Sequence, residues 1–241
     1  MKDWERYHNL RGDWHIHSTF SDGRNEPGEI IEAAISLGLE LVAITDHVNR
    51  ESEWLDDFVI EIERLKSRYD DKIKILSGIE AKVIDLDGNI DAREEFFKKV
   101  DIVLGAFHRI PNSNGFISRE EIPVERDRVL NFWYKAFLSL LEKDNHVDII
   151  AHPTNILKIN GIDVPLWMKR EITRVGRRTG KIFEFNLKYN VPDEEFINML
   201  REKDIPMSIG GDAHSVEELK ETYRRSKDIY NNMENIFYKT S

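Results

Sequence analysis

The chain of 241 residues contains no cysteine, and this absence restricts both its covalent structure and its metal chemistry. Without cysteine there is no disulfide framework, so the fold depends on a packed core. Any metal site must use histidine nitrogen and carboxylate oxygen, which suit divalent ions such as zinc, manganese or iron. Glutamine is absent as well, and 33% of the residues are charged, a combination typical of thermophilic proteins.

Long apolar stretches are also missing. No run approaches the roughly 20 apolar residues that cross a bilayer, and the first residues, Met1 to Arg6, lack the apolar core of a signal peptide. We therefore expect a cytoplasmic protein with no membrane partner. No linker-like or low-complexity segment divides the chain, which predicts a single domain over residues 1–241.

The sequence has no surplus of basic residues. It contains 35 Lys and Arg against 45 Asp and Glu, a formal net charge of -10. This charge disfavours non-specific binding to nucleic acid, which needs a basic surface. An anionic substrate is not excluded, because several divalent cations in one cleft make that cleft locally positive.

Short apolar segments alternate with amphipathic segments about seven times along the chain, which predicts βα units and a parallel α/β sheet. The strands are expected near His15 and His17 and at residues 39–44, 73–79, 100–107, 147–151, 181–186 and 205–209. Every strand except the sixth ends in a histidine or a carboxylate. A closed barrel brings all strand C-termini to one face, whereas an open sheet spreads them along an edge, so the pattern favours a barrel.

The histidines are concentrated at these strand ends. His15 and His17 alternate with apolar residues, so both imidazoles point to one side of a strand. Only His8 and His146, of eight histidines, fall outside this pattern, and both are expected on the surface. If these histidines were only buried, hydrogen-bonded residues, the position of each one at a strand end would be a coincidence. The candidate metal ligands are His15, His17, Asp22, His47, Glu80, His108, His152, Asp212 and His214. Asp13 and Asp46 are expected to hydrogen-bond to ligand histidines instead.

The chain resembles the polymerase and histidinol phosphatase (PHP) superfamily. The matching fragments follow the family's order: Asp13-Trp14-His15-Ile16-His17-Ser18, Thr45-Asp46-His47, Gly78-Ile79-Glu80, His108, Ala151-His152-Pro153 and Gly211-Asp212-Ala213-His214-Ser215. The resemblance implies a distorted seven-stranded (β/α)7 barrel with two or three divalent ions at the strand C-termini. The spacing is most similar to free-standing enzymes and to the corresponding domain of bacterial family X DNA polymerases, whose polymerase modules do not fit within this length.

The resemblance also implies a ligand set for each ion. One metal would lie on His15, His17, Glu80 and Asp212. A second would lie on Glu80, His108 and His152, so that Glu80 bridges the two. A third would use Asp22, His47 and His214, although some relatives have histidine where this chain has Asp22. Glu184 and Asn186 lie on a strand that is close to the site in relatives, and we expect them to support the ligands.

Such a cluster suits the hydrolysis of a phosphate ester. A hydroxide that bridges two metals is a nucleophile near neutral pH, and the cations neutralise charge on the phosphoryl oxygens. We expect the hydroxide between the metals that share Glu80, with Asp212 or Asp22 handling the proton. Basic residues on loops of the same face could meet the phosphate, although each is also an ordinary surface charge. These are Arg24, Arg109, Arg119, Lys158 and Lys188.

The preferred function is a metal-dependent phosphoesterase (EC class 3.1) that acts on a small phosphorylated metabolite, such as histidinol phosphate or a nucleotide phosphate. One alternative is a 3′-5′ exonuclease or another phosphodiesterase on nucleic acid, which the net charge disfavours. A second is an amidohydrolase, although those enzymes commonly bridge their metals with lysine, where this chain has Glu80. A third is a non-catalytic, metal-binding regulatory domain, yet no candidate ligand is replaced by an inert residue.

Overall fold

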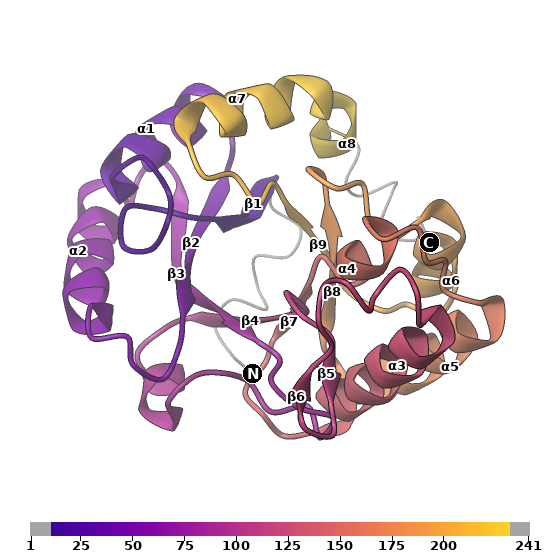
Figure 1. Ribbon diagram of the computed structural model, residues 1–241. Coiled ribbons are helices and arrows are strands. Elements are labelled where there is room, and N and C mark those ends of the chain that lie inside the picture. Colours follow the sequence, from indigo (N-terminus) through magenta and orange to yellow (C-terminus); the bar gives the residue numbers. More distant parts are fainter. Residues whose placement is uncertain (1–10, 232–241) are drawn as a thin grey trace.

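Seven parallel strands roll into a nearly closed barrel in the described part of the chain, residues 11–231 of a computed structural model (Figure 1). The strand order around the barrel is β1-β2-β3-β4-β7-β8-β9. The strands are β1 (Gly12–Ile16), β2 (Leu41–Val48), β3 (Lys74–Lys82), β4 (Ile102–Ala106), β7 (Ile149–Ala151), β8 (Ile182–Asn186) and β9 (Met207–Gly210). The predicted α/β barrel is therefore confirmed.

The first and last strands close the barrel only at their C-terminal ends. Ile16 and Ala213 form a parallel bridge. The backbone N–H of His17 donates to the carbonyl of Ala213 at 3.0 Å, and that of Asp212 donates to the carbonyl of His15 at 2.8 Å. The closing contacts thus involve the backbone of candidate metal ligands, so the seam and the candidate site are built together.

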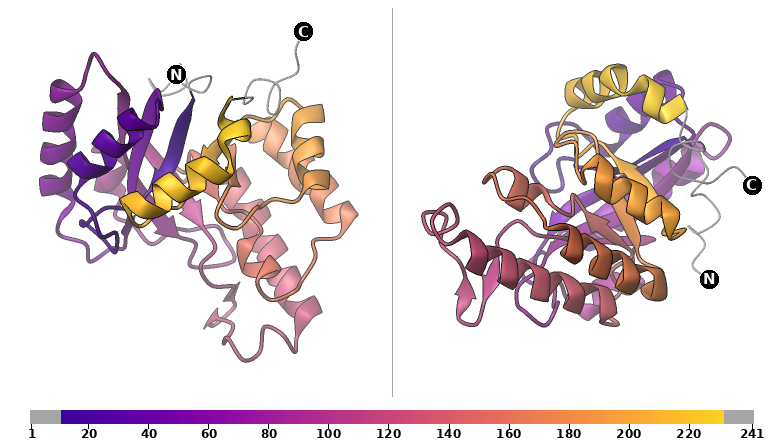
Figure 2. Two further views of the ribbon diagram at one scale, coloured as in Figure 1. Left: turned by 90° about the horizontal axis from the view of Figure 1, so that it is seen from above. Right: turned by 90° about the vertical axis from the view of Figure 1, so that its right-hand side faces the viewer.

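Helices surround the strands on the outside (Figures 1 and 2). They are α1 (Pro27–Ser36), α2 (Leu55–Arg68), α3 (Arg126–Glu142), α4 (Asn155–Lys158), α5 (Leu166–Thr179), α6 (Glu194–Glu202), α7 (Val216–Arg225) and α8 (Lys227–Asn231). The hydroxyl of Ser215 accepts the N–H of Glu218 and caps α7, which fixes the chain directly after His214. Among residues 11–231, no helix is both long and apolar enough to span a membrane.

The barrel interior below the site is apolar. Ten buried apolar side chains pack together there: Trp14, Leu41, Ala43, Leu76, Ile102, Leu104, Ala106, Ile149, Ala151 and Ile182. Side chains two residues apart on a strand share a face, so Leu76 lies on the same face as Glu80. A dry floor therefore supports the polar residues at the strand C-termini.

The structure differs from the expected elements in two respects. β2 and β3 extend beyond their predicted ends, because residues 45–48 pair in register with residues 78–81. His47 and Glu80 are consequently direct neighbours on adjacent strands. The loop predicted after His108 contains a hairpin of β5 (Pro111–Asn112) and β6 (Gly115–Phe116), and the loop after His152 contains α4.

A turn that packs on α3 gives a test of the fold. Gly88 has φ 73°, and a Cβ there would lie 2.5 Å from the backbone N of Leu140. Gly180 has a similar φ of 70°, with nothing within 4 Å of its Cβ position. We expect Gly180→Ala to cost about 1 kcal/mol, the cost of the left-handed conformation. Gly88→Ala should cost at least about 1 kcal/mol more, because backbone atoms must move.

Urea unfolding of both variants and of the wild type measures this difference. Equal destabilisation by the two substitutions would show that the turn does not pack against α3 as described.

Candidate metal centre

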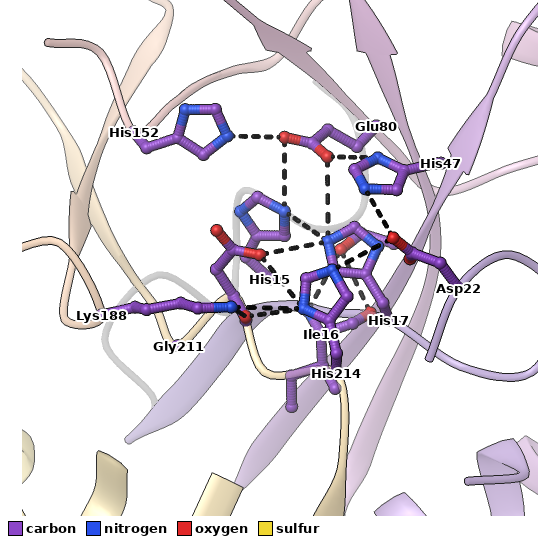
Figure 3. Close-up of polar contacts among 12 residues, drawn as sticks. His15, Ile16, His17, Asp22, His47, Glu80, His152, Lys188, Gly211 and His214 are labelled. Atoms are coloured by element: carbon purple, nitrogen blue, oxygen red, sulfur yellow. Dashed lines mark hydrogen bonds and ion pairs between the residues drawn. The ribbon is translucent and has the colours of Figure 1, made fainter. Parts of the chain in front are cut away.

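All nine predicted ligands converge at the C-terminal end of the barrel. Figure 3 labels His15, His17, Asp22, His47, Glu80, His152 and His214 among them. They come from the ends of β1, β2 and β3, from the residues that follow β4, β7 and β9, and from the loop before α1. In strand order, these residues are His15 and His17, His47, Glu80, His108, His152, Asp212 and His214, and Asp22. The structure therefore brings together every residue of the predicted set.

Glu80 is the centre of this group and is 1% exposed. Its Oε1 lies 2.8 Å from Nε2 of His152 and 3.2 Å from Nε2 of His108. Its Oε2 lies 2.7 Å from Nδ1 of His47. Nε2 of His15 is 3.5 Å from Oε1. One carboxylate thus contacts imidazoles from β1, β2 and the residues after β4 and β7.

A second, fully buried group lies deeper in the barrel. The Nε2 atoms of His15 and His17 face each other at 3.1 Å. Oδ1 of Asp212 lies 3.4 Å from Nε2 of His17. Nδ1 of His17 is buried and has no hydrogen-bond partner in the described part of the chain. Two facing imidazole nitrogens and a carboxylate oxygen are an arrangement that a divalent cation satisfies.

The third group is open to solvent. Oδ2 of Asp22 lies 3.6 Å from Nε2 of His47 and 3.5 Å from Nε2 of His214. The rings of His47 and His214 both pack against the ring of His17, with centroids 4.2 and 4.4 Å from its centroid. The carboxylate of Asp22 is 55% exposed, so this group forms the solvent-facing rim of the centre.

The donor sets fit divalent ions. Three groups each place one nitrogen or oxygen atom per residue within 4.8 Å of the others. The groups are His15, His17 and Asp212; His47, Glu80 and His108; and His17, Asp22, His47 and His214. They overlap with the expected sets, but they associate His47 with Glu80 as well as with Asp22. Imidazole and carboxylate donors without thiolate suit zinc, manganese or iron.

Residues around the ligands fix their orientation. Nδ1 of His15 lies 2.7 Å from Oε1 of Glu184, which leaves Nε2 for the centre. The other oxygen of Glu184 accepts the backbone N–H of His152 and the side-chain amide of Asn186 at 3.3 Å. Nδ1 of His214 is 3.0 Å from the carbonyl of Asp212. The supporting roles expected for Glu184 and Asn186 agree with these contacts.

The expectation for two other acidic residues was wrong in part. Asp46 accepts hydrogen bonds from the backbone and hydroxyl groups of Ser18 and Ser21, and within residues 11–231 it has no hydrogen bond to a histidine. It therefore orders the loop that carries Asp22. Asp13 accepts the backbone N–H of His15 at 3.1 Å and that of Gly211 at 2.8 Å, so it joins the two sides of the seam.

The buried charges shift one another's pKa. Burial lowers the pKa of His15, but the charges of Glu184 and Glu80 outweigh burial and bring the net pKa well above 6.5. Burial also opposes protonation of His152 and His47, yet the hydrogen bond to Glu80 raises the pKa of each above 6.5. Burial lowers the pKa of His17 to about 4, so His17 stays neutral. For Glu80, burial is outweighed by His108 and His15, which hold its pKa well below 4.5.

Unlike the predicted metal ligands, the predicted substrate-binding residues do not all converge on the centre. Nζ of Lys188 donates to the carbonyl of Asp212 at 3.0 Å, at the edge of the centre (Figure 3). Nζ of Lys158 donates to the carbonyls of Tyr189 and Asn190, which ties α4 to the segment after β8. Arg24, Arg109 and Arg119 are exposed. The guanidinium of Arg109 lies 4.6 Å from the centroid of the Phe116 ring.

Two cavities adjoin the centre and reveal wall residues that the sequence analysis missed. The ligand lobe, about 240 Å³, lies over the ligands and, beside them, is walled by Phe107, Asn155, Ile156, Ile159 and Tyr189. The polar lobe, about 490 Å³, is lined by His47, Val48, Asn49, Arg50, Glu51, Glu80, Lys82, Asp91 and His108. Lys82 follows Glu80 by two residues, so strand periodicity could have indicated that it faces the same side.

Comparison with known proteins identifies the family. The PHP domain model matches residues 13–190. The chain belongs to the PHP domain family. A DNA polymerase/3'-5' exonuclease PolX of Bacillus subtilis is 28% identical over 221 residues, 87% of this chain but 35% of that protein. The chain thus spans about a third of that relative's length. A probable phosphatase of Acetivibrio thermocellus is 28% identical over 195 residues, 77% of this chain and 71% of that protein.

Solved structures share the fold of this PHP domain. A candidate histidinol phosphatase, HisK, from Listeria monocytogenes superimposes with a TM-score of 0.72 at 16% identity, covering 89% of this chain and 99% of that one. The histidinol phosphate phosphatase of Lactococcus lactis, solved with zinc, L-histidinol and phosphate, superimposes with a TM-score of 0.61 at 18% identity, covering 89% and 93%. At these identities the likeness establishes the barrel fold.

The contacts of Glu184 lead to a test by substitution. In Glu184→Gln an amide N–H₂ or carbonyl must face Nδ1 of His15, and the charge that fixes the ring is lost. We expect metal affinity to fall by about 10- to 100-fold, as for other carboxylates that orient metal-bound histidines. Metal titration monitored by calorimetry measures this change, and circular dichroism checks the fold.

Asp101→Asn is the matched control, because the Asp101 carboxylate also accepts a backbone N–H, that of Ser77 at 2.8 Å, near the start of β4. It should bind metal as the wild type does. An affinity of Glu184→Gln within about threefold of the wild type would contradict the role assigned to Glu184.

The raised histidine pKa values determine how the metal-free protein responds to pH. Protonation of His15, His47 and His152 stabilises the folded state below their unfolded value of 6.5, and this contribution disappears as pH rises through the higher folded values. The Tm of metal-free protein should therefore fall as the pH rises above 6.5. Glu80 does not contribute to this change, because its pKa lies below 4.5.

Bound metal replaces these protons, so metal affinity should rise over the same interval. Calorimetric melts with chelator and with added manganese, from about pH 6 to about pH 9, test both trends. A metal-free Tm that rises across the interval would show that the imidazoles are not held protonated by Glu80 and Glu184.

Proposed function

We propose that this PHP domain protein hydrolyses a phosphate ester on a cluster of two or three divalent metal ions. The observation that supports this proposal is the position of Glu80, a buried carboxylate whose two oxygens contact imidazoles from separate groups of candidate ligands. A bridging carboxylate is the ligand that draws two cations together over one phosphoryl group. The phosphatases named among the relatives agree with this chemistry.

The proposed ligands for the metals are the nine converging residues, with Glu80 shared between His15, His17 and Asp212 on one side and His108 and His152 on the other. His47, His214 and Asp22 hold the more exposed position. Divalent cations, when bound there, supply Lewis acidity that activates water near neutral pH and neutralises charge on phosphoryl oxygens.

Two carboxylates are available to handle protons, and their surroundings differ. Burial opposes ionisation of Asp212, but the hydrogen bond from His17 and nearby positive charge outweigh it and keep its pKa below the usual range. Asp212 therefore remains a carboxylate, as suits a ligand. Asp22 is more than half exposed and contacts His47 and His214, so it is the better placed of the two to exchange a proton with solvent.

A small phosphorylated metabolite is the substrate that the surroundings favour. The net charge of -10 opposes association with a long nucleic acid, and lobes of about 240 and 490 Å³ suit a small molecule. Histidinol phosphate is one candidate, since a barrel of this fold has been solved with L-histidinol and phosphate. Lys188, beside Asp212, is the best placed of the predicted basic residues to meet the phosphoryl group.

Two other functions remain to be separated from this one by experiment. Cleavage of a phosphodiester in nucleic acid is suggested by the Bacillus subtilis relative, whose name includes a 3'-5' exonuclease and which matches 87% of this chain. A regulatory role without catalysis would require metal binding without turnover. We favour catalysis, because eight of the nine predicted ligands fall in groups able to hold a metal ion, and the ninth, His152, contacts Glu80 at 2.8 Å.

The direct test compares p-nitrophenyl phosphate with bis-p-nitrophenyl phosphate after metal removal and reconstitution with manganese or zinc. Metal-dependent turnover with preference for the monoester supports a metabolite phosphatase. Preference for the diester would overturn the proposed substrate and favour a phosphodiesterase. Bound metal without turnover of either ester, or of histidinol phosphate, would favour the regulatory role.

Substitution of Glu80 supplies the matching mutational test. Glu80→Gln keeps the size of the side chain but removes the charge that balances the histidines and the metals. We expect kcat to fall by more than about 100-fold, beyond the loss typical of residues that only support a ligand. Glu171→Gln on α5, where the carboxylate pairs with Arg174 outside both cavities of the centre, is the control and should keep wild-type kcat. Wild-type turnover in metal-loaded Glu80→Gln would exclude Glu80 as the bridging residue.

A further inference from the structure

The ligand lobe has an uncharged wall beside the candidate metal ligands. Apart from those ligands, the lobe is lined by Phe107, Asn155, Ile156, Ile159 and Tyr189. Three of these side chains are apolar, one is a phenol and one is a neutral amide. The polar lobe differs, because charged side chains of both signs line it. A group that extends from the metal centre along the uncharged wall therefore meets no formal charge besides the ligands.

Ile159 is an unusual member of the uncharged wall, because it is apolar and yet 64% exposed. Five large hydrophobic side chains are exposed within residues 11–231, and Ile159 is the one that lines the cavity over the ligands. A single exposed apolar residue is normal on a protein surface, but this one continues a wall that Ile156 and Phe107 also form. It leaves apolar surface beside the metal centre that a bound group can cover.

The short helix α4 presents two isoleucines to the lobe. Ile156 and Ile159 are three residues apart, and Ile159 keeps helical dihedral angles (φ -64°, ψ -19°) at the end of the helix. Their side chains therefore share one face of α4. Leu157, between them in the chain, is fully buried in the core and anchors the helix. The face with the two isoleucines is thereby left to line the lobe.

Lys158 connects α4 to the segment after β8, which carries Tyr189. Its Nζ donates to the carbonyls of Tyr189 and Asn190, both at 2.8 Å. The backbone N–H of Tyr189 donates to Oδ1 of Asn186 at 3.0 Å. The ring of Tyr189 meets that of His152 edge-on, with centroids 6.1 Å apart. These contacts hold the two parts of the uncharged wall in place relative to each other and to a candidate ligand.

We propose that the uncharged wall binds the organic part of the phosphate ester, so that the substrate carries an apolar, uncharged group next to the phosphoryl group. This inference rests on the proposed phosphoesterase activity and specifies its substrate class: small alkyl or aryl monophosphates in preference to phosphates of polyols. Ile156 and Ile159 contact this group from α4, and Tyr189 contacts it from the segment after β8. Lys158 is a positioning residue for the wall and does not bind the phosphate.

A series of alkyl monophosphates tests the proposed substrate class. The substrates run from ethyl to hexyl phosphate, all esters of primary alcohols with similar reactivity, and are assayed with the manganese-loaded protein. We expect KM to fall by about tenfold or more along the series, because each methylene that leaves water adds affinity. A KM that changes by less than about twofold from ethyl to hexyl phosphate would overturn the proposal.

A polar ester of equal size provides the matched comparison. In 5-hydroxypentyl phosphate a hydroxyl replaces the terminal methyl group of hexyl phosphate. We expect its KM to be about threefold or more above that of hexyl phosphate, because the hydroxyl loses water against apolar side chains. A lower KM for the hydroxylated ester would show that the organic group binds among polar side chains, and would overturn the proposal.

Substitution of Ile159 should weaken the preference for long esters. Ile159→Thr keeps the branched Cβ but places a hydroxyl on the wall, so the ratio of KM for ethyl phosphate to KM for hexyl phosphate should fall by about threefold or more. Ile60→Thr on α2 is the matched control and should keep the ratio, because Ile60 is 68% exposed and lines neither lobe. A wild-type ratio in Ile159→Thr, or an equal loss in both variants, would contradict the proposal.

Lys158→Met separates the positioning role from a contact with phosphate. It keeps the apolar stem but removes the ammonium group that donates to two carbonyls, so the same KM ratio should fall. Lys158→Arg retains donors for these carbonyls and should restore most of the ratio. Loss of a phosphate contact would instead raise KM for ethyl and hexyl phosphate by the same factor. That result would contradict the positioning role of Lys158.

Failure of the proposed phosphoesterase and failure of the proposed substrate class give different results. Absence of metal-dependent turnover for every ester would refute the phosphoesterase. Metal-dependent turnover with a KM that does not depend on chain length would refute the role of the uncharged wall alone.

Discussion

The structure depends on one buried negative charge, the carboxylate of Glu80. A carboxylate taken out of water is costly unless it is paired and hydrogen-bonded. Here the partners are imidazoles from β1 and β2 and from the residues after β4 and β7, with Nε2 of His152 at 2.8 Å and Nδ1 of His47 at 2.7 Å. Metal ions would compensate the same charge more completely. The carboxylate therefore requires the barrel to bring four strand ends to one point.

This convergence is accompanied by backbone strain at two candidate ligands. His152 and Asp212 have positive φ values of 28° and 49°, conformations that non-glycine residues rarely adopt. Strain of this kind persists where the surrounding structure fixes it, and here Glu184 accepts the N–H of His152 while the seam holds Asp212. Gly210 and Gly211 leave room for Glu184 and Asp13, since a Cβ at either glycine would lie within 2.4 Å of a carboxylate oxygen.

Much of the fold and nearly all of the candidate centre could be predicted, because the signals are local. Alternation around His15 and His17 fixes one face of a strand, and parallel strands in a barrel end on one face. Contacts between distant segments could not be predicted in the same way. Asp46 precedes His47, yet it hydrogen-bonds to Ser18 and Ser21 of another loop. Phe116 gathers Lys82 and Arg109 through a hairpin of two short strands, which has too few residues for a periodic pattern.

The surroundings of the centre extend the argument from metals to substrate. One lobe lies over the ligands, walled in part by Phe107, Ile156 and Ile159, and a second, polar lobe lies beside it. Both lobes share His47, Glu80 and His108, so selectivity and metal binding are properties of the same strand ends. Variation in the segment after β2, which lines the polar lobe, would change the walls of the site without altering the metal ligands.

A crystal structure of manganese-loaded protein, with anomalous difference density to locate the ions, tests the central claim most directly. The account predicts at least two ions, one on each side of Glu80, each coordinated by one of its oxygens and by the neighbouring histidines. An occupied centre in which Glu80 touches no ion, or a centre that binds no metal at saturating manganese, would contradict it.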